Sequence, residues 1–299
     1  MSGFFRGHKR RGAFDLFSSY NNYMPGVSGM IMMLALFVMG AILGRWVSDF
    51  FSEIYGGDAV LHYGSLICYP LLFIPAMLYA SVQSRLYIHH YSPIEIDCNN
   101  FGTYGGFKLT LVAAVMILTA AFIVEPVCLL LPEPTQDFVL QMKMAIEIPP
   151  IWVTFIVTCI FAPFFEEWMC RGIILRGLLR RHNPAIAIIG SAAFFGIIHM
   201  NIWQGVPAFL IGLVLGYVYY KSGSLKLTMF MHMLNNAVSL ILIQIPECKE
   251  AESMMDLMSP LGYAGAFIAL AVAFTAALIV IHSLPNREGL QEIKDSAKL

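Results

Sequence analysis

Residues 151–175 read IWVTFIVTCIFAPFFEEWMCRGIIL and place three ionisable side chains within a long apolar run. A helix that crosses a bilayer needs about 20 mostly apolar residues, so this stretch is long enough to span one. Its ionisable members are Glu166, Glu167 and Arg171. Ionisable groups are costly at membrane depth and usually serve a function there. The stretch therefore predicts a transmembrane helix that carries chemistry.

The rest of the chain has the composition of a membrane protein. Of its 299 residues, 58% are hydrophobic and 12% are charged, whereas soluble domains carry about 25% charged residues. Seven further apolar runs qualify as spans, some of them marginally. They cover Met30 to Val47, Ser65 to Val82, Leu109 to Leu131, Ala185 to Met200, Val206 to Tyr220, Leu225 to Ile245 and Leu261 to Leu284. The sequence predicts an all-α, polytopic integral membrane protein with about eight transmembrane helices and an intramembrane active site.

The lysines and arginines predict the orientation of these spans. With a cytoplasmic N-terminus and eight alternating spans, 15 of the 18 basic residues fall on the inner side, among them clusters at residues 6–11 and 287–298. The three on the outer side are Arg45, Lys143 and Lys249. This asymmetry predicts that both termini are cytoplasmic. The outer segment from Pro132 to Pro150 is long enough for a short surface helix.

Other classes of protein fit the sequence poorly. It has no basic face that would suggest a nucleic-acid partner. The six cysteines form no CxxC motif and lie mostly in apolar runs, so we expect buried free thiols rather than disulfides or a cysteine zinc site. Histidines 62, 89, 90 and 182 lie in predicted loops. We find no repeat or soluble appendage, and we predict one membrane domain over residues 1–299.

Helical spacing separates the roles of the charged residues. Glu167 and Arg171 stand at positions i and i+4, on one face, with the acid nearer the helix N-terminus, as ion pairs prefer. Such a pair keeps both charges compensated in a low dielectric. Glu166 points about 100° away and has no local partner. A partly desolvated carboxylate of this kind suits the work of a general base.

Two further apolar runs contribute histidines. One carries Phe195 and, four residues later, His199, and the other carries His232 and Asn236 at positions i and i+4. His232 and Asn236 can both donate hydrogen bonds toward one point, as an oxyanion requires. His199 could hold an attacking water against Glu166. Either histidine alone is more simply an interhelical hydrogen-bonding group, but the combination favours a catalytic site.

The three motifs also resemble those of a known family. Glu166-Glu167-x-x-x-Arg171, Phe195-x-x-x-His199 and His232-x-x-x-Asn236 occur in order, with intervals of 33 residues from Glu166 to His199 and from His199 to His232. They resemble the motifs of the CPBP intramembrane proteases, which include type II CAAX prenyl endopeptidases and bacteriocin-processing and immunity proteins. The resemblance covers residues 151–245, which we take as the catalytic core. The first three spans carry no motif.

The resemblance implies an endopeptidase that uses glutamate-activated water on membrane-anchored substrates, with prenylated CAAX-like proteins or peptides as one such class. Its partners would be these substrates and the lipid bilayer. The roles that the resemblance implies agree with the geometric assignment. Glu166 would act as the base, helped by His199, and His232 and Asn236 would stabilise the oxyanion. Glu167 and Arg171, with Phe195 beside them, would support the helix that carries Glu166, which we call the motif helix.

Three alternatives stand beside this interpretation. A zinc-dependent protease would use Glu166, His199 and His232 as a His₂Glu ligand set; no HExxH motif is present, and we favour a reaction without a metal or other cofactor. A proton-coupled transporter would use the same buried groups as a relay, but no inverted repeat is evident. A non-catalytic membrane scaffold is the third alternative, against which the intact motifs argue.

Overall fold

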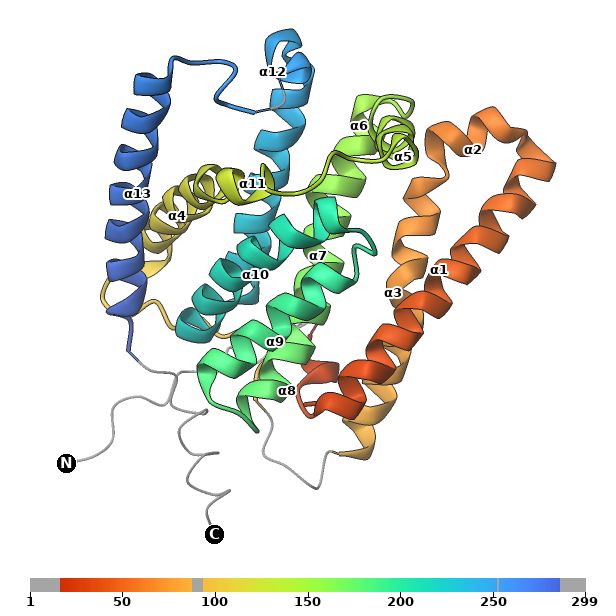
Figure 1. Cartoon of the computed structure of the whole chain (residues 1–299). Coiled ribbons are helices and arrows are strands. Elements are labelled where there is room, and N and C mark those ends of the chain that lie inside the picture. Colours follow the sequence, from red (N-terminus) through yellow and green to blue (C-terminus); the bar gives the residue numbers. More distant parts are fainter. Residues whose placement is uncertain (1–16, 88–93, 252, 286–299) are drawn as a thin grey trace.

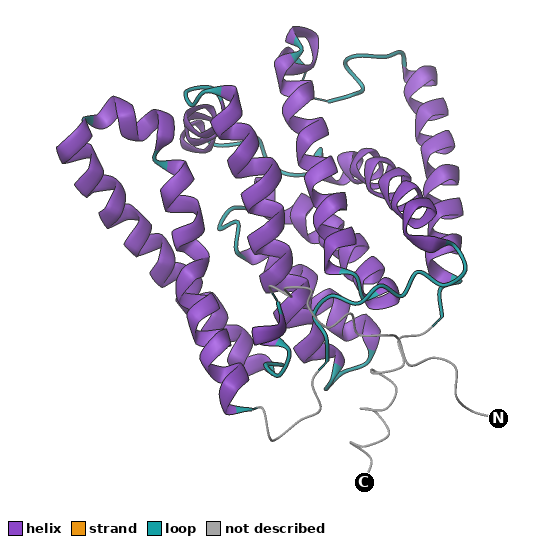
Figure 2. Cartoon of the chain, turned by 180° about the vertical axis from the view of Figure 1, so that it is seen from behind, coloured by secondary structure: helices purple, strands orange, loops and turns teal. Residues whose placement is uncertain are grey.

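The chain folds into a bundle of helices. A computed structural model describes residues 17–87, 94–251 and 253–285. Within these ranges every regular element is a helix and none is a strand (Figure 2). The predicted all-α class is confirmed. The basic clusters at residues 6–11 and 287–298, together with His89 and His90, lie outside the described residues.

Seven helices are long and apolar enough to cross a membrane, and the chain is a polytopic integral membrane protein. They are α1 (Val27–Tyr55), α3 (Ser65–Leu86), α4 (Gly105–Cys128), the continuous helix Ile151–Leu179, α10 (Ile202–Ser222), α11 (Leu225–Gln244) and α13 (Pro260–His282). The shorter elements are η1 (Ser18–Tyr20), α2 (Gly57–Tyr63), α5 (Gln136–Ile146), α9 (Pro184–Ile197) and α12 (Pro246–Glu250). Helix α5 lies within the segment from Pro132 to Pro150, which is long enough for a short surface helix.

The predicted fifth span is shorter than expected. Helix α9 has 14 residues, so it is about 21 Å long, against about 30 Å for a hydrocarbon core. The apolar run continues to Met200, but the chain reverses there, with a φ of 58° at Met200. The Asn201 side chain then accepts a hydrogen bond from the backbone of Gln204 and caps α10. The predicted fifth span is therefore a short helix, and His199 lies in the turn beyond its end.

Helices α9 and α10 form a tight hairpin around this turn. A Cβ atom at Gly196 would lie 2.7 Å from the carbonyl oxygen of Gly205, so only glycine permits the backbones to come this close. About two turns further along α10, a Cβ at Gly212 would lie 3.2 Å from the Phe195 ring. Glycine spacing thus fixes the position of the turn that holds His199.

The helix Ile151–Leu179 is the central element of the bundle. In its most apolar window 61% of residues are buried, against 11–33% in the other six long helices. It is not a regular α-helix. Segments α6 (Ile151–Phe155), α7 (Ala162–Glu167) and α8 (Arg176–Leu179) alternate with two π-helical segments, η2 (Ile156–Phe161) and η3 (Trp168–Leu175). π-Helical geometry is rare and often marks functional sites.

The other helices pack around this centre in two clusters. One joins α1 and α3 to the central helix and α9, and the other joins α4, α10, α11 and α13. Helix α13 turns large apolar residues outward, with Leu261 85% exposed and Ile268 65% exposed. In a membrane such a face meets lipid.

The elements that join the long helices alternate between the two ends of the bundle. Figure 1 shows α2, α5 and α12 at one end and the start of α9 at the other. The three basic residues predicted to lie outside belong to this first end: Arg45 in the last turns of α1 before α2, Lys143 in α5 and Lys249 in α12. The helix order therefore agrees with alternating crossings.

We expect the end that carries α2, α5 and α12 to face away from the cytoplasm. Single cysteines at Asp58, Leu257 and Arg85, in a background with the six native cysteines replaced by serine, test this with a membrane-impermeant maleimide. Asp58→Cys and Leu257→Cys should react in intact cells, and Arg85→Cys only after permeabilisation. Reaction of Arg85→Cys alone in intact cells would invert the orientation.

Candidate active site

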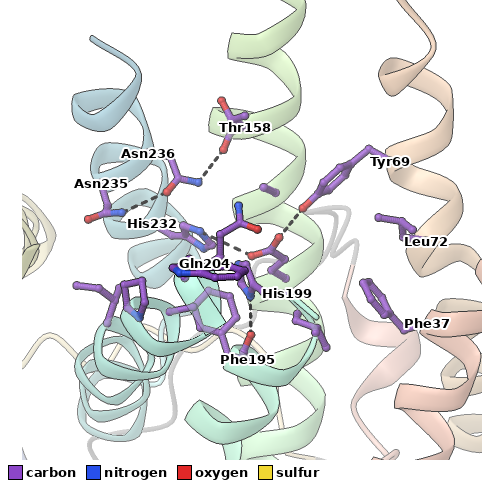
Figure 3. Close-up of a pocket in the computed structure, with 17 residues that line it drawn as sticks. Phe37, Tyr69, Leu72, Thr158, Phe195, His199, Gln204, His232, Asn235 and Asn236 are labelled. Carbon is purple, nitrogen blue, oxygen red and sulfur yellow. Dashed lines mark hydrogen bonds and ion pairs between the residues drawn. The ribbon is translucent and has the colours of Figure 1, made fainter. Parts of the chain in front are cut away.

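One cavity collects the four residues predicted to be catalytic. It measures about 500 Å³, and Glu166, His199, His232 and Asn236 all line it (Figure 3). Glu166 comes from α7, His232 and Asn236 from α11, and His199 from the turn after α9. Phe195 also lines the cavity, whereas Glu167 and Arg171 lie behind it with no exposed surface.

The Glu167–Arg171 ion pair holds the motif helix against its neighbours. Nη1 of Arg171 lies 2.7 Å from Oε1 of Glu167, and both side chains are fully buried. Nη2 of Arg171 donates a 3.1 Å hydrogen bond to the carbonyl oxygen of Gly212 in α10. The guanidinium also lies 4.5 Å from the centre of the Phe195 ring in α9, a cation–π distance. One arginine thus ties the central helix to α9 and α10.

His232 connects the two glutamates. Its Nδ1 lies 3.2 Å from Oε1 of Glu167, and its Nε2 lies 3.8 Å from Oε2 of Glu166. An ionised carboxylate only accepts hydrogen bonds, so Nδ1 is the donor to Glu167. Glu167 therefore sets the orientation of the ring and turns Nε2 toward Glu166. The sequence assigned Glu166 no local partner, and this approach of His232 from α11 is a contact that helical spacing alone does not reveal.

His199 is held in a similar way by a backbone group. Its Nδ1 lies 2.8 Å from the carbonyl oxygen of Phe195. Because a carbonyl only accepts, Nδ1 carries the proton and Nε2 is left available. The Phe195 ring meets the ring of His199 edge-on at 5.2 Å and that of His232 edge-on at 5.5 Å. Phe195 thus contacts Arg171 and both histidines.

The orientation of Asn236 follows from an irregularity in the central helix. The N–H of Ala162 bonds to the carbonyl of Val157 rather than that of Thr158, and the next residue, Pro163, has no N–H. The Thr158 carbonyl therefore loses both helical donors, and it accepts a 2.8 Å hydrogen bond from Nδ2 of Asn236. On the other side, Asn235 donates to Oδ1 of Asn236 at 3.2 Å. These two bonds fix the amide and leave one Nδ2 hydrogen for a ligand.

Tyr69 is a site residue that sequence reasoning missed. It lies in α3, lines the cavity and donates a hydrogen bond to Oε1 of Glu166 (Figure 3). The first three spans carry no motif, and no spacing rule pairs a tyrosine with a glutamate 97 positions later. Thr158 and Asn235 were missed as well. Pro163, three residues before Glu166, was the available signal for the altered hydrogen bonding at Thr158.

The three residues considered above as zinc ligands, Glu166, His199 and His232, all line the cavity. Within the described ranges, no three or more His, Cys, Asp or Glu side chains form a group that could hold a metal ion. The six cysteines are free thiols; Cys159 and Cys170 are buried, as expected, whereas the other four are only partly buried.

Comparison with known proteins bears on the same segment. Residues 148–238 match the family model described as Rce1-like, type II CAAX prenyl endopeptidase Rce1-like. This match supports the assignment of these residues to the CPBP family. The resemblance noted from the three motifs is thereby confirmed, and all seven motif residues fall inside the match. Neither a search of curated proteins nor one of solved structures found a match.

The matched family is one of proteases, and the matched segment does not include α1, α3 or α4. Tyr69 therefore reaches the active site from outside the segment that the family defines. The finding extends the site beyond residues 151–245, which the sequence motifs mark as the catalytic core.

Glu167→Gln should lower stability, because it leaves the buried Arg171 without a counter-charge. Breaking a buried pair in this way costs about 3–5 kcal/mol. The matched control is Asp49→Asn, which breaks the Arg45–Asp49 pair, also at i and i+4 but with side chains 79% and 62% exposed; exposed pairs contribute about 0–1 kcal/mol. Thermal unfolding in detergent should show a large loss for the first variant and little for the second. Equal decreases in melting temperature for the two variants would contradict the conclusion that the buried pair stabilises the fold more than the exposed pair.

Proposed function

We propose that the chain is an intramembrane endopeptidase in which Glu166 activates the attacking water. The supporting observation is the position of Glu166: its side chain is buried, lines the cavity, and turns Oε2 toward Nε2 of His232 at 3.8 Å. His199 and Asn236 line the same cavity. Peptide hydrolysis needs a general base, a second group that holds the water, and donors that stabilise the oxyanion. Glu166 and His199 suit the first two roles, and the amide of Asn236 and the imidazole of His232 suit the third.

In the proposed reaction, water lies between Glu166 and Nε2 of His199. Glu166 takes one proton as the water oxygen bonds to the peptide carbonyl carbon. The carbonyl oxygen becomes an oxyanion, which accepts hydrogen bonds from Nδ2 of Asn236 and from His232. The tetrahedral intermediate collapses when Glu166 returns the proton to the departing amine, which breaks the C–N bond. Glu166 begins and ends the cycle as a carboxylate.

The role of His232 depends on its charge. With Nδ1 donating to Glu167, a neutral ring has only a lone pair at Nε2, whereas an imidazolium donates there. We propose that His232 stabilises the oxyanion as an imidazolium and that Glu167 supports this form.

The proposed substrates are membrane-anchored proteins or peptides. The family to which residues 148–238 match is described as a CAAX prenyl endopeptidase, which makes a prenylated C-terminal tail the first substrate to test. The cavity offers apolar walls beside its polar centre, formed in part by Phe37, Leu72 and Ile211. Such walls suit a lipidated or membrane-spanning segment.

Glu166→Gln should abolish turnover and preserve the fold, because the amide has nearly the same shape but cannot take a proton. Loss of a general base lowers rates by about 100- to 10,000-fold. Release of the C-terminal tripeptide from a farnesylated CAAX peptide, measured by mass spectrometry in proteoliposomes, gives the rate. Thermal unfolding of the same preparation is the control. A Glu166→Gln variant that cleaves at the wild-type rate would exclude this mechanism.

We expect the reaction to need no metal ion. Protein incubated with a strong chelator and freed of it by gel filtration should retain its peptide-cleaving rate, since the proposed steps use only side chains and water. Metal content of the same sample is measured by elemental mass spectrometry. Activity lost with the chelator and recovered on addition of zinc would favour the metalloprotease alternative.

A further inference from the structure

Tyr69, in the first half of the chain, contacts Glu166. Its phenol donates to Oε1 of Glu166, and its ring is partly buried at the edge of the cavity. Figure 3 shows the side chain reaching across from α3 to the motif helix. This hydrogen bond joins α3 to α7. It is separate from the hydrogen bonds that hold Glu167, Arg171 and the two histidines.

Aromatic packing fixes the axial position of α3 next to Glu166. Phe73, one turn beyond Tyr69, stacks on Phe165 with ring centres 5.3 Å apart and an angle of 13°. Phe165 directly precedes Glu166. Phe73 also meets Phe37 of α1 at 5.3 Å and is 1% exposed. Rings with this little freedom fix the register of α3 against α7, so the position of the Tyr69 phenol is set by the core and not by Glu166 itself.

The two oxygens of Glu166 therefore have different surroundings. Oε1 accepts from Tyr69, and Oε2 faces Nε2 of His232 at 3.8 Å, a gap longer than a direct hydrogen bond. A carboxylate held at one oxygen cannot turn freely about its last torsion, which is otherwise broad. Oε2 is therefore the oxygen that faces His232, one of the residues assigned to stabilise the oxyanion.

We propose that Tyr69 is a positioning residue of the active site, which holds Oε1 of Glu166 so that Oε2 is the oxygen that accepts the proton from water. This inference rests on the proposed function of Glu166 as the base. It makes the α3 helix, outside the matched family segment, part of the catalytic apparatus. Without the phenol the carboxylate remains in place but samples orientations in which neither oxygen faces the water.

A double-mutant cycle tests the contact without any substrate. Tyr69→Phe keeps the ring that packs on Phe73 and removes only the hydroxyl. The melting temperature of the full chain in detergent should fall on Tyr69→Phe in the wild-type background and change little in a Glu166→Ala background, since coupled sites are not additive. The control, Tyr63→Phe, removes an exposed hydroxyl that does not line the cavity and should give equal, small shifts in both backgrounds. Equal losses for Tyr69→Phe in the two backgrounds would overturn the inference.

Turnover of the farnesylated CAAX peptide tests the positioning role. Tyr69→Phe should lower kcat by about 10- to 100-fold, the rate equivalent of a hydrogen bond to a charged group, and leave KM within about twofold, because the phenol does not bind substrate. A raised KM with unchanged kcat would indicate a role in binding instead and would contradict the proposal.

Parallel measurement of Glu166→Gln separates the two claims. An inactive Glu166→Gln with a fully active Tyr69→Phe overturns the role of Tyr69 and leaves the proposed function intact. An active Glu166→Gln overturns the proposed function. If the wild-type chain does not cleave this peptide, the melting-temperature cycle decides the Tyr69–Glu166 contact on which the inference depends.

Discussion

The compensation of charge within the bilayer is the constraint on which the rest of the structure depends. Glu167 and Arg171 have no exposed surface, and either one alone would be an uncompensated charge in a low dielectric. Their pairing leaves three further contacts, to His232, Gly212 and Phe195. Each contact joins the central helix to a different neighbour, so satisfying one ion pair also aligns α9, α10 and α11.

The site is built where helical regularity fails. Pro163 and the π-helical register free the Thr158 carbonyl, and that carbonyl orients Asn236. Helix α9 ends after 14 residues, and the turn beyond it carries His199 into the cavity. Irregular backbone inside a membrane is tolerated where it lines a cavity or is buried in protein. The π-helical segment therefore orients Asn236, and the end of α9 places His199 in the cavity.

Sequence reasoning was sufficient for features that depend on local spacing. Apolar runs predict the long helices, because the bilayer sets their length and composition. The i, i+4 relation of Glu167 and Arg171 predicts an ion pair that the structure contains, and three ordered motifs predict the family core that residues 148–238 match. Hydropathy could not show that α9 stops short, since Ile198 and Met200 are as apolar as the helix before them.

Contacts between distant segments were beyond the reach of spacing rules. Tyr69 is an ordinary residue of an apolar run, and only the packing of α3 brings it to Glu166. The approach of His232 to both glutamates likewise depends on where α11 lies. The identity of candidate metal ligands can be read from the sequence, whereas the distances between them cannot; among the described residues, no group of three or more His, Cys, Asp or Glu side chains could hold a metal ion.

The central claim is that Glu166 acts on water and not as a nucleophile. A single turnover in ¹⁸O-labelled water, with enzyme in excess over a farnesylated CAAX peptide, tests it directly. If Glu166 is a general base, the label should appear in the new carboxyl group of the product and not in the Glu166 side chain, as measured by mass spectrometry of both peptides. Label in the Glu166 carboxylate would reveal a covalent anhydride intermediate and contradict the account.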